Sequence, residues 1–430
     1  MKMNKIMVSM LAAGVIASPL AHATNGYFRI GVGDKAESMG GAGIALPQDS
    51  LAAGTNPAGM VMVGDRVDFG LTWFKPNRSM EITGNTLTSP PFPVAGSMDG
   101  TYDGNGKSNF FIPDFGYNKM IKSDMSLGIT VWGAGGMNTQ YDTTPLALLG
   151  GQSPVGVDLQ QLFIAPTWAM KVNPTNYVGA SLVGVYQMFK ATGLQPFACP
   201  TTALCGGGPV PSASPSNVTN NGTDTSTGVG LRLGWTGQVS DMVTLGATYQ
   251  PKISMSKFSK YSGLFADQGN FDIPANYGVG IAVKANDATT VAFDAVQIKY
   301  SGVPSVGNSS SIPQQFGSTG GPGFGWQDMT VLKLGTMYAL NPGLTLRAGV
   351  NHNTQQIGTK DAFFNFLAPG VVQNHLTLGA TWKLANQSEV TVGYVHAFEQ
   401  TVTGPIAAGF GGGTASIKMH EDSIGVTYGW

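Results

Sequence analysis

Residues 344–351 read Leu-Thr-Leu-Arg-Ala-Gly-Val-Asn, and apolar side chains occupy every second position of this stretch. A period of two residues places apolar and polar side chains on opposite faces of an extended strand. The same alternation recurs at 376–384 and 229–236. In a membrane barrel the apolar face would meet lipid, whereas in a soluble sandwich it would meet a protein core. The period alone does not separate these two folds.

Similar segments of about ten residues, separated by turn residues, follow one another from Arg66 onward. They predict strands at 66–78, 107–118, 124–134, 158–172, 175–191, 225–239, 242–255, 274–284, 288–299, 328–339, 343–354, 372–383, 388–400 and 415–429. These are about fourteen strands, an even number, as in closed single-chain bacterial barrels. The links at 173–175 and 341–343 are tight, whereas those at 191–224 and 300–327 are long. Short periplasmic turns and long outer loops give this asymmetry, and an even count places both ends of the barrel chain on the periplasmic side.

The composition favours the membrane barrel. Charged residues make up 11% of the chain, whereas a soluble domain usually carries about 25%. A barrel needs few charges because it turns an uncharged band toward lipid. Beyond the first residues no apolar run approaches the length of a spanning helix. The net charge is −1 without a basic block, so nothing indicates nucleic acid.

The first residues are typical of a secretory signal. Lys2 and Lys5 precede an apolar run at 6–17, and Ala21-His22-Ala23 forms an A-x-A cleavage site. The run is shorter than the about 20 residues that a membrane-spanning helix needs. We therefore expect residues 1–23 to be a cleaved signal peptide and the protein to be exported to the cell outer membrane of a Gram-negative bacterium.

The last predicted strand ends in an aromatic residue, Trp430, after Ile424, Val426 and Tyr428. Barrels of this class commonly end in an aromatic residue, and such an ending is typical of the signal for their assembly. We expect Trp430 to engage the barrel-assembly machinery. The alternative is an ordinary edge strand that ends in Trp by chance.

Residues 24–64 lack the two-residue alternation and are rich in small side chains. They contain the glycine-rich run 39–43 and the triplet Asn56, Pro57 and Ala58. Such a stretch can fold compactly in a confined space without a core of its own. We expect 24–64 to form a plug, or hatch, inside a barrel of residues 65–430. A loose leader without function is the alternative, and a phosphate loop is excluded because no Lys-Ser/Thr follows the glycines.

The chain resembles the FadL and TodX family of outer-membrane transporters for long-chain fatty acids and aromatic hydrocarbons. The resemblance rests on Asn25-Gly26-Tyr27, the run 39–43, Asn56-Pro57-Ala58, the strand 127–132 leading into 133–136, and 344–350. It implies a fourteen-stranded barrel plugged by an N-terminal hatch. It also implies a kink in the third strand, which opens the wall so that ligand leaves sideways.

Gly133, Gly135 and Gly136 supply a physical reason for such a kink, because glycine weakens a strand ladder and tolerates the backbone angles of a bulge. Gly136 matches the kink of the family, and we expect Asn56-Pro57-Ala58 to pack near the same opening. The alternative is that these glycines merely begin a loop.

Two apolar groups lie in predicted outer loops, where exposed apolar side chains usually mark a binding surface. One group consists of Leu146, Leu148 and Leu149, in the region that captures ligand first in the family. The other consists of Phe363, Phe364 and Phe366, which either join the capture surface or simply pack between loops.

Lumen-facing cations predicted from strand parity are Arg232, Lys284, Lys333 and Arg347. One or two of them could bind a fatty-acid carboxylate in a dry pocket, and we select Lys333 and Arg347. Alternatively they pair only with other lumen charges such as Asp294. Where fatty-acid transporters are expected to carry a basic pair, this chain has Met188 and Gln327, which favours a neutral hydrocarbon.

Cys199 and Cys205 are the only cysteines and lie in a stretch dense in Pro, Gly, Ser and Asn. Export to an oxidising compartment predicts a disulfide that staples this loop. Two cysteines without nearby histidines make a poor metal site, and neither metal nor cofactor is expected.

The sequence thus predicts transport of hydrophobic small molecules. The alternative is a general water-filled porin, which the low charge and the plug-like segment disfavour. An outer-membrane enzyme is a third class, but none of the five histidines lies in a recognisable catalytic or metal motif. Besides its ligand, the protein is expected to contact outer-membrane lipid and lipopolysaccharide.

Overall fold

The structure is a computed structural model that describes residues 25–88, 95–202, 205 and 209–430. Its strands form a closed antiparallel barrel of 14 strands, in which each strand pairs with its neighbours along the chain and β15 pairs back onto β1. The short strand β2 pairs only with β1 and does not belong to the barrel wall. The expected signal peptide lies outside the described residues.

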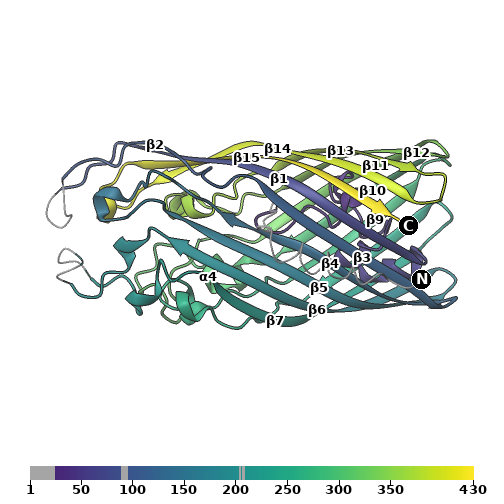
Figure 1. Ribbon diagram of the computed structural model, residues 1–430, viewed down its shortest axis with the longest axis horizontal. Coiled ribbons are helices and arrows are strands. Elements are labelled where there is room, and N and C mark those ends of the chain that lie inside the picture. Colours follow the sequence, from purple (N-terminus) through teal and green to yellow (C-terminus); the bar gives the residue numbers. More distant parts are fainter. Residues whose placement is uncertain (1–24, 89–94, 203–204, 206–208) are drawn as a thin grey trace.

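Each predicted strand falls on one strand of the barrel. The strands are β1 (Arg66–Thr83), β2 (Gly100–Asp103), β3 (Phe110–Lys122), β4 (Met125–Asn138), β5 (Gly156–Asn173), β6 (Asn176–Thr192), β7 (Asp224–Gln238), β8 (Val243–Gln250), β9 (Asn276–Lys284), β10 (Thr289–Ile298), β11 (Met329–Asn341), β12 (Leu344–Asn353), β13 (Asn374–Lys383), β14 (Glu389–Pro405) and β15 (Thr414–Gly429). They run obliquely along the barrel (Figure 1). We call the end that carries the short connections and the C-terminus the turn end, and the other end the loop end.

The helices are short. They are α2 (Asp34–Glu37), α3 (Ala266–Gly269) and α4 (Pro304–Gly307), together with the 3-10 helices η1 (Ala52–Gly54), η2 (Pro57–Met62), η3 (Ala147–Leu149), η4 (Gln195–Phe197), η5 (Pro215–Asn217), η6 (Ser259–Tyr261), η7 (Tyr300–Gly302), η8 (Thr359–Asp361), η9 (Phe364–Leu367) and η10 (Ala408–Phe410). Within the described part of the chain, no helix has the length and apolar character that crossing a membrane requires.

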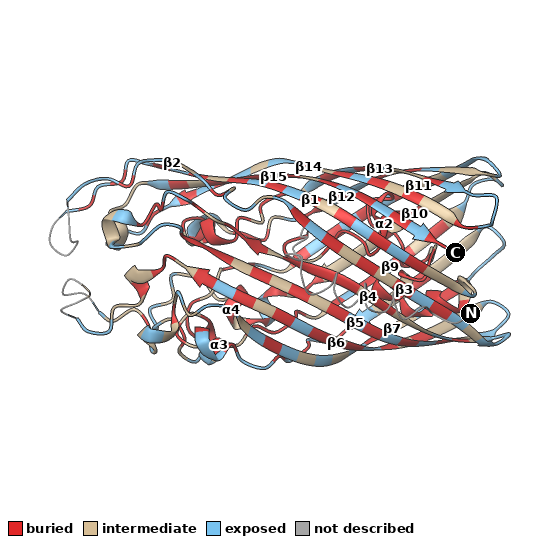
Figure 2. Ribbon diagram, viewed as in Figure 1, coloured by how far each residue is buried: buried red, intermediate tan, exposed pale blue. Residues whose placement is uncertain are grey.

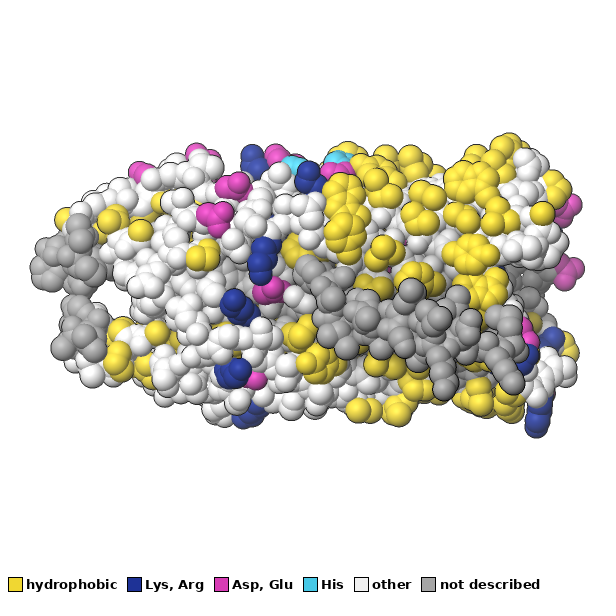
Figure 3. All heavy atoms as spheres, in the orientation of Figure 1, with side chains coloured by type: hydrophobic (Ala, Val, Ile, Leu, Met, Phe, Trp, Pro, Cys, Tyr) yellow, Lys and Arg dark blue, Asp and Glu magenta, His cyan; other side chains and the backbone are white. Residues whose placement is uncertain are grey.

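The alternation in the strands separates an apolar outer face from a polar inner face. On β12, Leu346 is 40% exposed and Arg347 only 7% exposed. Exposed and buried residues alternate along the strands in the same way (Figure 2). Exposed apolar side chains gather over the turn-end half of the barrel, and charged side chains border them toward the loop end (Figure 3). The apolar faces therefore do not meet a core, which excludes the soluble sandwich.

The C-terminal strand closes the barrel. Trp430 and Val67 exchange two backbone hydrogen bonds of 2.9 Å each, and β15 is flanked by β14 and β1. The last strand is therefore not a free edge strand.

Residues 25–64, which we call the N-terminal segment, pack against the inner face of the wall. Many inward-facing strand positions next to the segment are glycines, and a methyl group at these glycines would lie less than 3.0 Å from a segment atom. They are Gly116, Gly128, Gly179, Gly234, Gly246, Gly278, Gly280, Gly335, Gly349, Gly379, Gly393 and Gly425. The bare backbone of the wall thus makes room for the segment on most sides of the lumen.

Candidate functional site

The ladder between β3 and β4 is incomplete. It runs from the pair Lys122–Met125 at the turn end to the pair Asp114–Trp132. Beyond that pair, residues 110–113 of β3 still pair with β1, and β4 still pairs with β5 up to Asn138. Among the described residues no backbone pair joins these two stretches to each other. The barrel wall therefore lacks interstrand hydrogen bonds between these parts of β3 and β4, its second and third strands.

Two of the predicted kink glycines carry the irregularity of β4. Gly135 and Gly136 have φ angles of 130° and 132°, which side-chain-bearing residues rarely adopt. The pairing of β4 with β5 shifts register between Gly135 and Asn138. Gly133, by contrast, pairs regularly with Leu162. The strand thus continues past these glycines with a bulge instead of ending in a loop.

An ion-pair triad ties the N-terminal segment to the point where β3 and β4 part. Arg29 donates to Asp114 at 2.6 Å and to Glu37 at 2.8 Å. All three side chains are at most 3% exposed. One guanidinium faces two carboxyl groups here, and burial raises the pKa of Glu37 to about 7 although Arg29 opposes the shift.

A second network ties the segment to the turn end of the barrel. Glu389 accepts from Lys35 at 2.6 Å and from Arg66 at 2.7 Å. Arg66 also bonds Asp68 at 2.8 Å, and Asp68 accepts from the Ser50 hydroxyl at 2.6 Å. Two independent charge networks therefore hold the segment in the lumen.

A cavity of about 80 Å³ lies between the N-terminal segment and the inner wall. Its lining includes Ala134 of the interrupted strand and three cations, Arg29, Arg232 and Lys333. Trp132 and Phe163 form one wall and stack with ring centres 5.0 Å apart. No acidic residue is among the described side chains that line the cavity.

The predicted lumen cations differ in their surroundings. Lys333 donates to the carbonyl oxygens of Ile30 at 2.7 Å and Gly41 at 3.4 Å. Arg347 donates to Gln48 at 2.9 Å and to Thr381 at 2.6 Å. Both cations therefore hold the N-terminal segment or its surroundings, and Lys333 also reaches the cavity.

One expectation about the lumen charges is wrong. Lys284 does not face the lumen, because it pairs with Asp287 at the turn end, where its side chain is 50% exposed. Asp294 lies opposite Lys333 in the register of β10 and β11, and the two charges attract each other, although no direct ion pair joins them among the described residues. The Asp294 carboxylate accepts the backbone amides of Gly43 and Ile44 at 2.8 and 3.0 Å, so it also anchors the segment.

The reason given for a neutral ligand is also wrong. Met188 has the parity of Leu182 and Tyr186, which face outward on β6. Gln327 is exposed in the loop before β11. Neither side chain points into the lumen, so neither reports on the charge of a ligand there.

The triplet Asn56, Pro57 and Ala58 lies against β6 and β7. Asn56 caps η2 by accepting the Ala58 amide at 3.1 Å, and its amide group donates to the carbonyl oxygen of Trp235 on β7 at 3.0 Å. Pro57 and Ala58 approach Gly179 of β6. We expected the triplet to lie at the gap between β3 and β4, and this expectation is wrong. Met60 of the same helix reaches β4, at Gly128.

The two apolar loop groups form one cluster at the loop end. Leu146, Phe363 and Phe366 are buried, and Leu148, Leu149 and Phe364 pack against the same core. Tyr141 joins the two loops by donating to the carbonyl oxygen of Phe366 at 2.9 Å. The structure thus brings the two groups together but buries most of the surface that we expected to be exposed.

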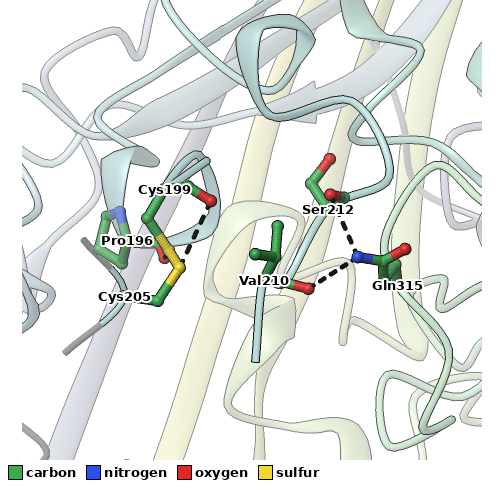
Figure 4. The surroundings of a disulfide bond; sticks show 6 residues. All are labelled: Pro196, Cys199, Cys205, Val210, Ser212 and Gln315. Carbon is green, nitrogen blue, oxygen red and sulfur yellow. Dashed lines mark hydrogen bonds between the residues drawn. A yellow bond between two sulfur atoms is a disulfide. The ribbon is translucent and has the colours of Figure 1, made fainter. Parts of the chain in front are cut away.

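Cys199 and Cys205 form a disulfide bond in the loop after β6 (Figure 4). In the same region Gln315 donates to the Val210 carbonyl oxygen at 3.0 Å, which joins this loop to the one that follows β10.

Four residues around the cavity and the gap were not predicted from the sequence: Arg29, Asp114, Trp132 and Asn276. A usable signal existed for Asp114 alone, because it is an acidic residue at an inward position of a predicted strand.

A closed barrel with an outer apolar band, a lumen occupied by its own N-terminal segment and one interrupted strand pair defines a transport barrel of the outer membrane. The sequence profile described as "Outer membrane protein transport protein (OMPP1/FadL/TodX)" matches residues 30–408. The chain therefore belongs to the OMPP1/FadL/TodX family.

Solved structures show the same fold at low sequence identity. The Pseudomonas putida toluene transporter TodX is 17% identical, with a TM-score of 0.62 over 93% of this chain and 98% of that one. The Ralstonia pickettii toluene transporter TbuX is 19% identical, with a TM-score of 0.61 over 93% and 98%. A Pseudomonas aeruginosa FadL homologue is 17% identical, with a TM-score of 0.66 over 96% and 99%. No curated protein matches the sequence.

Proposed function

We propose that this protein carries small hydrophobic molecules, either long-chain fatty acids or aromatic and aliphatic hydrocarbons, across the outer membrane. The ligand is captured at the apolar loop cluster and leaves the lumen sideways between β3 and β4. The N-terminal segment acts as the hatch that keeps the lumen closed to water. The end of the β3–β4 ladder at Asp114 and Trp132 carries this proposal.

The gap can serve as the exit because a break in the ladder is tolerated at membrane depth only where protein or ligand fills it. Family membership and the fold shared with two toluene transporters support a hydrophobic ligand. A general porin is disfavoured because two charge networks and many close backbone contacts hold the segment in the lumen. We propose no enzymatic activity.

The exit route can be tested by closing the gap with a disulfide. Continuing the register past Asp114–Trp132 would place Ile112 opposite Ala134. We expect an oxidised Ile112→Cys/Ala134→Cys barrel to lose uptake of radiolabelled toluene and oleate, and reductant to restore it. The matched control is Tyr117→Cys/Ile129→Cys, a pair already joined in the same ladder, which should transport normally when oxidised. Normal uptake by the cross-linked Ile112–Ala134 barrel would contradict lateral exit.

We also propose that residues 1–23 are removed on export and that Trp430 is read by the barrel-assembly machinery. The mutual hydrogen bonds of Trp430 and Val67 support a role in closing the barrel. A Trp430→Ser protein should accumulate less folded barrel in the outer membrane, which immunoblotting of membrane fractions would measure. Contact with outer-membrane lipid and lipopolysaccharide is proposed for the exposed apolar band and its charged border (Figure 3).

A further inference from the structure

We propose that Leu162 determines the size of the molecules that leave through the gap between β3 and β4. Its side chain fills the gap from the outer face of the wall, inside a frame whose two ends are held by hydrogen bonds. The inference rests on the proposed function, because it names the residue that sets ligand size at the same exit.

The loop end of the gap is closed by the connection from β2 to β3. Within this connection, Gly104 donates its backbone amide to the carbonyl oxygen of Arg78 on β1 at 3.0 Å. On the other side, Gly104 accepts from the backbone amide of Gln140 at 3.2 Å, and Gly106 donates to the Gln140 carbonyl oxygen at 3.0 Å. Residues 104–106 therefore take the place of β3 between β1 and the chain that follows β4.

The side chain of Arg78 fastens the same end of the gap. Arg78 is buried, and its guanidinium donates to the carbonyl oxygens of Asn138, at the end of β4, and of Lys107. Asp158 of β5 continues this connection, because it accepts from the side-chain amide of Asn138 at 2.7 Å and from Lys107 at 3.3 Å. The strands β1, β4 and β5 are thus tied together at the loop end of the gap.

The gap therefore has a fixed length. Its turn end is the pair Asp114–Trp132, and its loop end is the connection that Arg78 fastens. The stretch of β3 between these ends is residues 110–113, which spans about 13 Å at the usual rise of a strand. Since both ends are held, the room for a ligand depends on the side chains that occupy the gap.

Leu162 of β5 faces outward beside the gap. The residues before and after it, Gln161 and Phe163, line the lumen cavity, so the alternation of a strand turns Leu162 to the outer face. Its partner on β4 is Gly133, whose lack of a side chain leaves room over β4. Leu162 can therefore extend across β4 toward β3.

Leu162 packs against residues of the inner face. It contacts the buried cluster of Phe74 on β1 and Phe110 and Ile112 on β3. These three residues are at most 1% exposed, and β4 separates their strands from β5. An outward side chain reaches inward ones beyond β4 only through the gap. Leu162 is accordingly less exposed than Ile164, the next outward residue of β5, which is 39% exposed.

An apolar side chain in this place can close the wall and still yield to a ligand. A break in the ladder at membrane depth must be filled by protein or ligand, and Leu162 fills it with a group that makes no hydrogen bonds. A leucine side chain changes between staggered rotamers, so a departing molecule can displace it without breaking either end of the frame. The room that this movement releases sets the largest molecule that passes.

The test compares uptake of toluene, which is flat, with uptake of adamantane, a compact hydrocarbon that is thick in every direction. Cells that carry the full-length protein or a variant are exposed to both compounds, gas chromatography measures each initial rate of uptake, and uptake by cells without the protein is subtracted. Leu162→Ala should raise the ratio of adamantane to toluene uptake by about tenfold, the discrimination that small changes of volume provide in an apolar site. Leu162→Trp should lower the ratio by a similar factor.

The matched control is Ile164→Ala. The partner of Ile164 is Val131, which lies where β3 and β4 still pair, opposite Phe115. This variant removes a similar outward side chain from the same strand and should leave the ratio unchanged. Heat-modifiable migration on gels identifies the variants that form folded barrels, and if one Leu162 variant fails to fold, the other decides.

An unchanged ratio in the folded Leu162 variants, or an equal change in Ile164→Ala, would overturn the inference. The cross-linked Ile112–Ala134 barrel tests lateral exit separately. If that barrel loses uptake while the Leu162 variants keep the original ratio, lateral exit stands and the assignment of Leu162 fails.

Discussion

Arg29 of the N-terminal segment donates to Asp114 at 2.6 Å, at the residue where β3 makes its last pair with β4. The segment and the edge of the gap are therefore held by one buried interaction. Moving the segment would require breaking this ion pair, so displacement of the segment and widening of the gap are linked in the structure.

Replacing Arg29 should destabilise the protein strongly. Arg29→Met leaves Glu37 and Asp114 buried without a cation, and breaking a buried ion pair from one side typically costs about 3–5 kcal/mol. Denaturant unfolding should show this loss. The comparison variant is Lys119→Met, which removes the exposed ion pair to Asp65 and should change stability little. Similar stabilities for the two variants would contradict the importance of the triad.

Glu37 should make stability depend on pH. Burial raises its pKa from the ordinary 4.5 to about 7, so between these values the folded protein binds more protons than the unfolded chain. Stability is then greatest below about pH 4.5 and falls as the pH rises through 7, by up to about 3 kcal/mol. Glu37→Gln should flatten the thermal stability profile between pH 6 and 8.

Asp49 provides the matched control for this measurement. Burial raises the pKa of Asp49 to about 6. Asp49→Asn should therefore alter the thermal stability mainly at lower pH and leave the slope of the profile near pH 7 unchanged. An unchanged slope in Glu37→Gln would show that another group titrates there.

Gly136→Val should block transport. A valine disfavours the φ of 132° at this position and would draw β4 toward regular strand geometry across the gap. We expect hydrophobic uptake to be lost while leakage of small polar solutes stays the same. The strain should lower stability by about 1–3 kcal/mol. Gly184→Val on β6, where a methyl group meets only ordinary contacts, should keep both stability and uptake; normal uptake by folded Gly136→Val would refute the route.

The loop cysteines should be oxidised in the cell. Protein taken from the outer membrane and denatured without reductant should show no labelling of free thiols at Cys199 or Cys205. After reduction both residues should label, which serves as the internal control. Quantitative labelling of both before reduction would contradict the disulfide.

The barrel could be predicted from the sequence because each strand carries its own alternation of side chains. On β12 the positions predicted to face inward at Arg347, Gly349 and Asn351 are the buried ones, since a regular strand keeps its parity. On β14 the parity of the positions no longer predicts the facing of the side chains along the whole strand. A register shift between Ala397 and Gln400 reverses the parity, and the strand continues to Pro405 although the prediction stopped at 400.

Features of the site could be predicted only where neighbouring residues in the sequence form them. Gly135 and Gly136 stand out because glycine is the residue that accepts their backbone angles. Arg29 and Asp114 are 85 positions apart, and Arg232 and Trp132 come from strands that do not pair with each other. Closure of the barrel and placement of the segment bring them together, and no short sequence pattern encodes either event.

The glycines that face the N-terminal segment also constrain how this protein can evolve and be engineered. At Gly349 an added methyl carbon would lie 2.2 Å from the segment backbone at Met39 and Gly40, and at Gly425 it would lie 1.8 Å from the Asp34 carboxylate. A larger side chain at one of these wall glycines requires a compensating change in the segment, and the reverse also holds. The segment and the wall therefore form a co-adapted unit. A chimera that takes its segment from one relative and its strands from another should therefore fail to assemble.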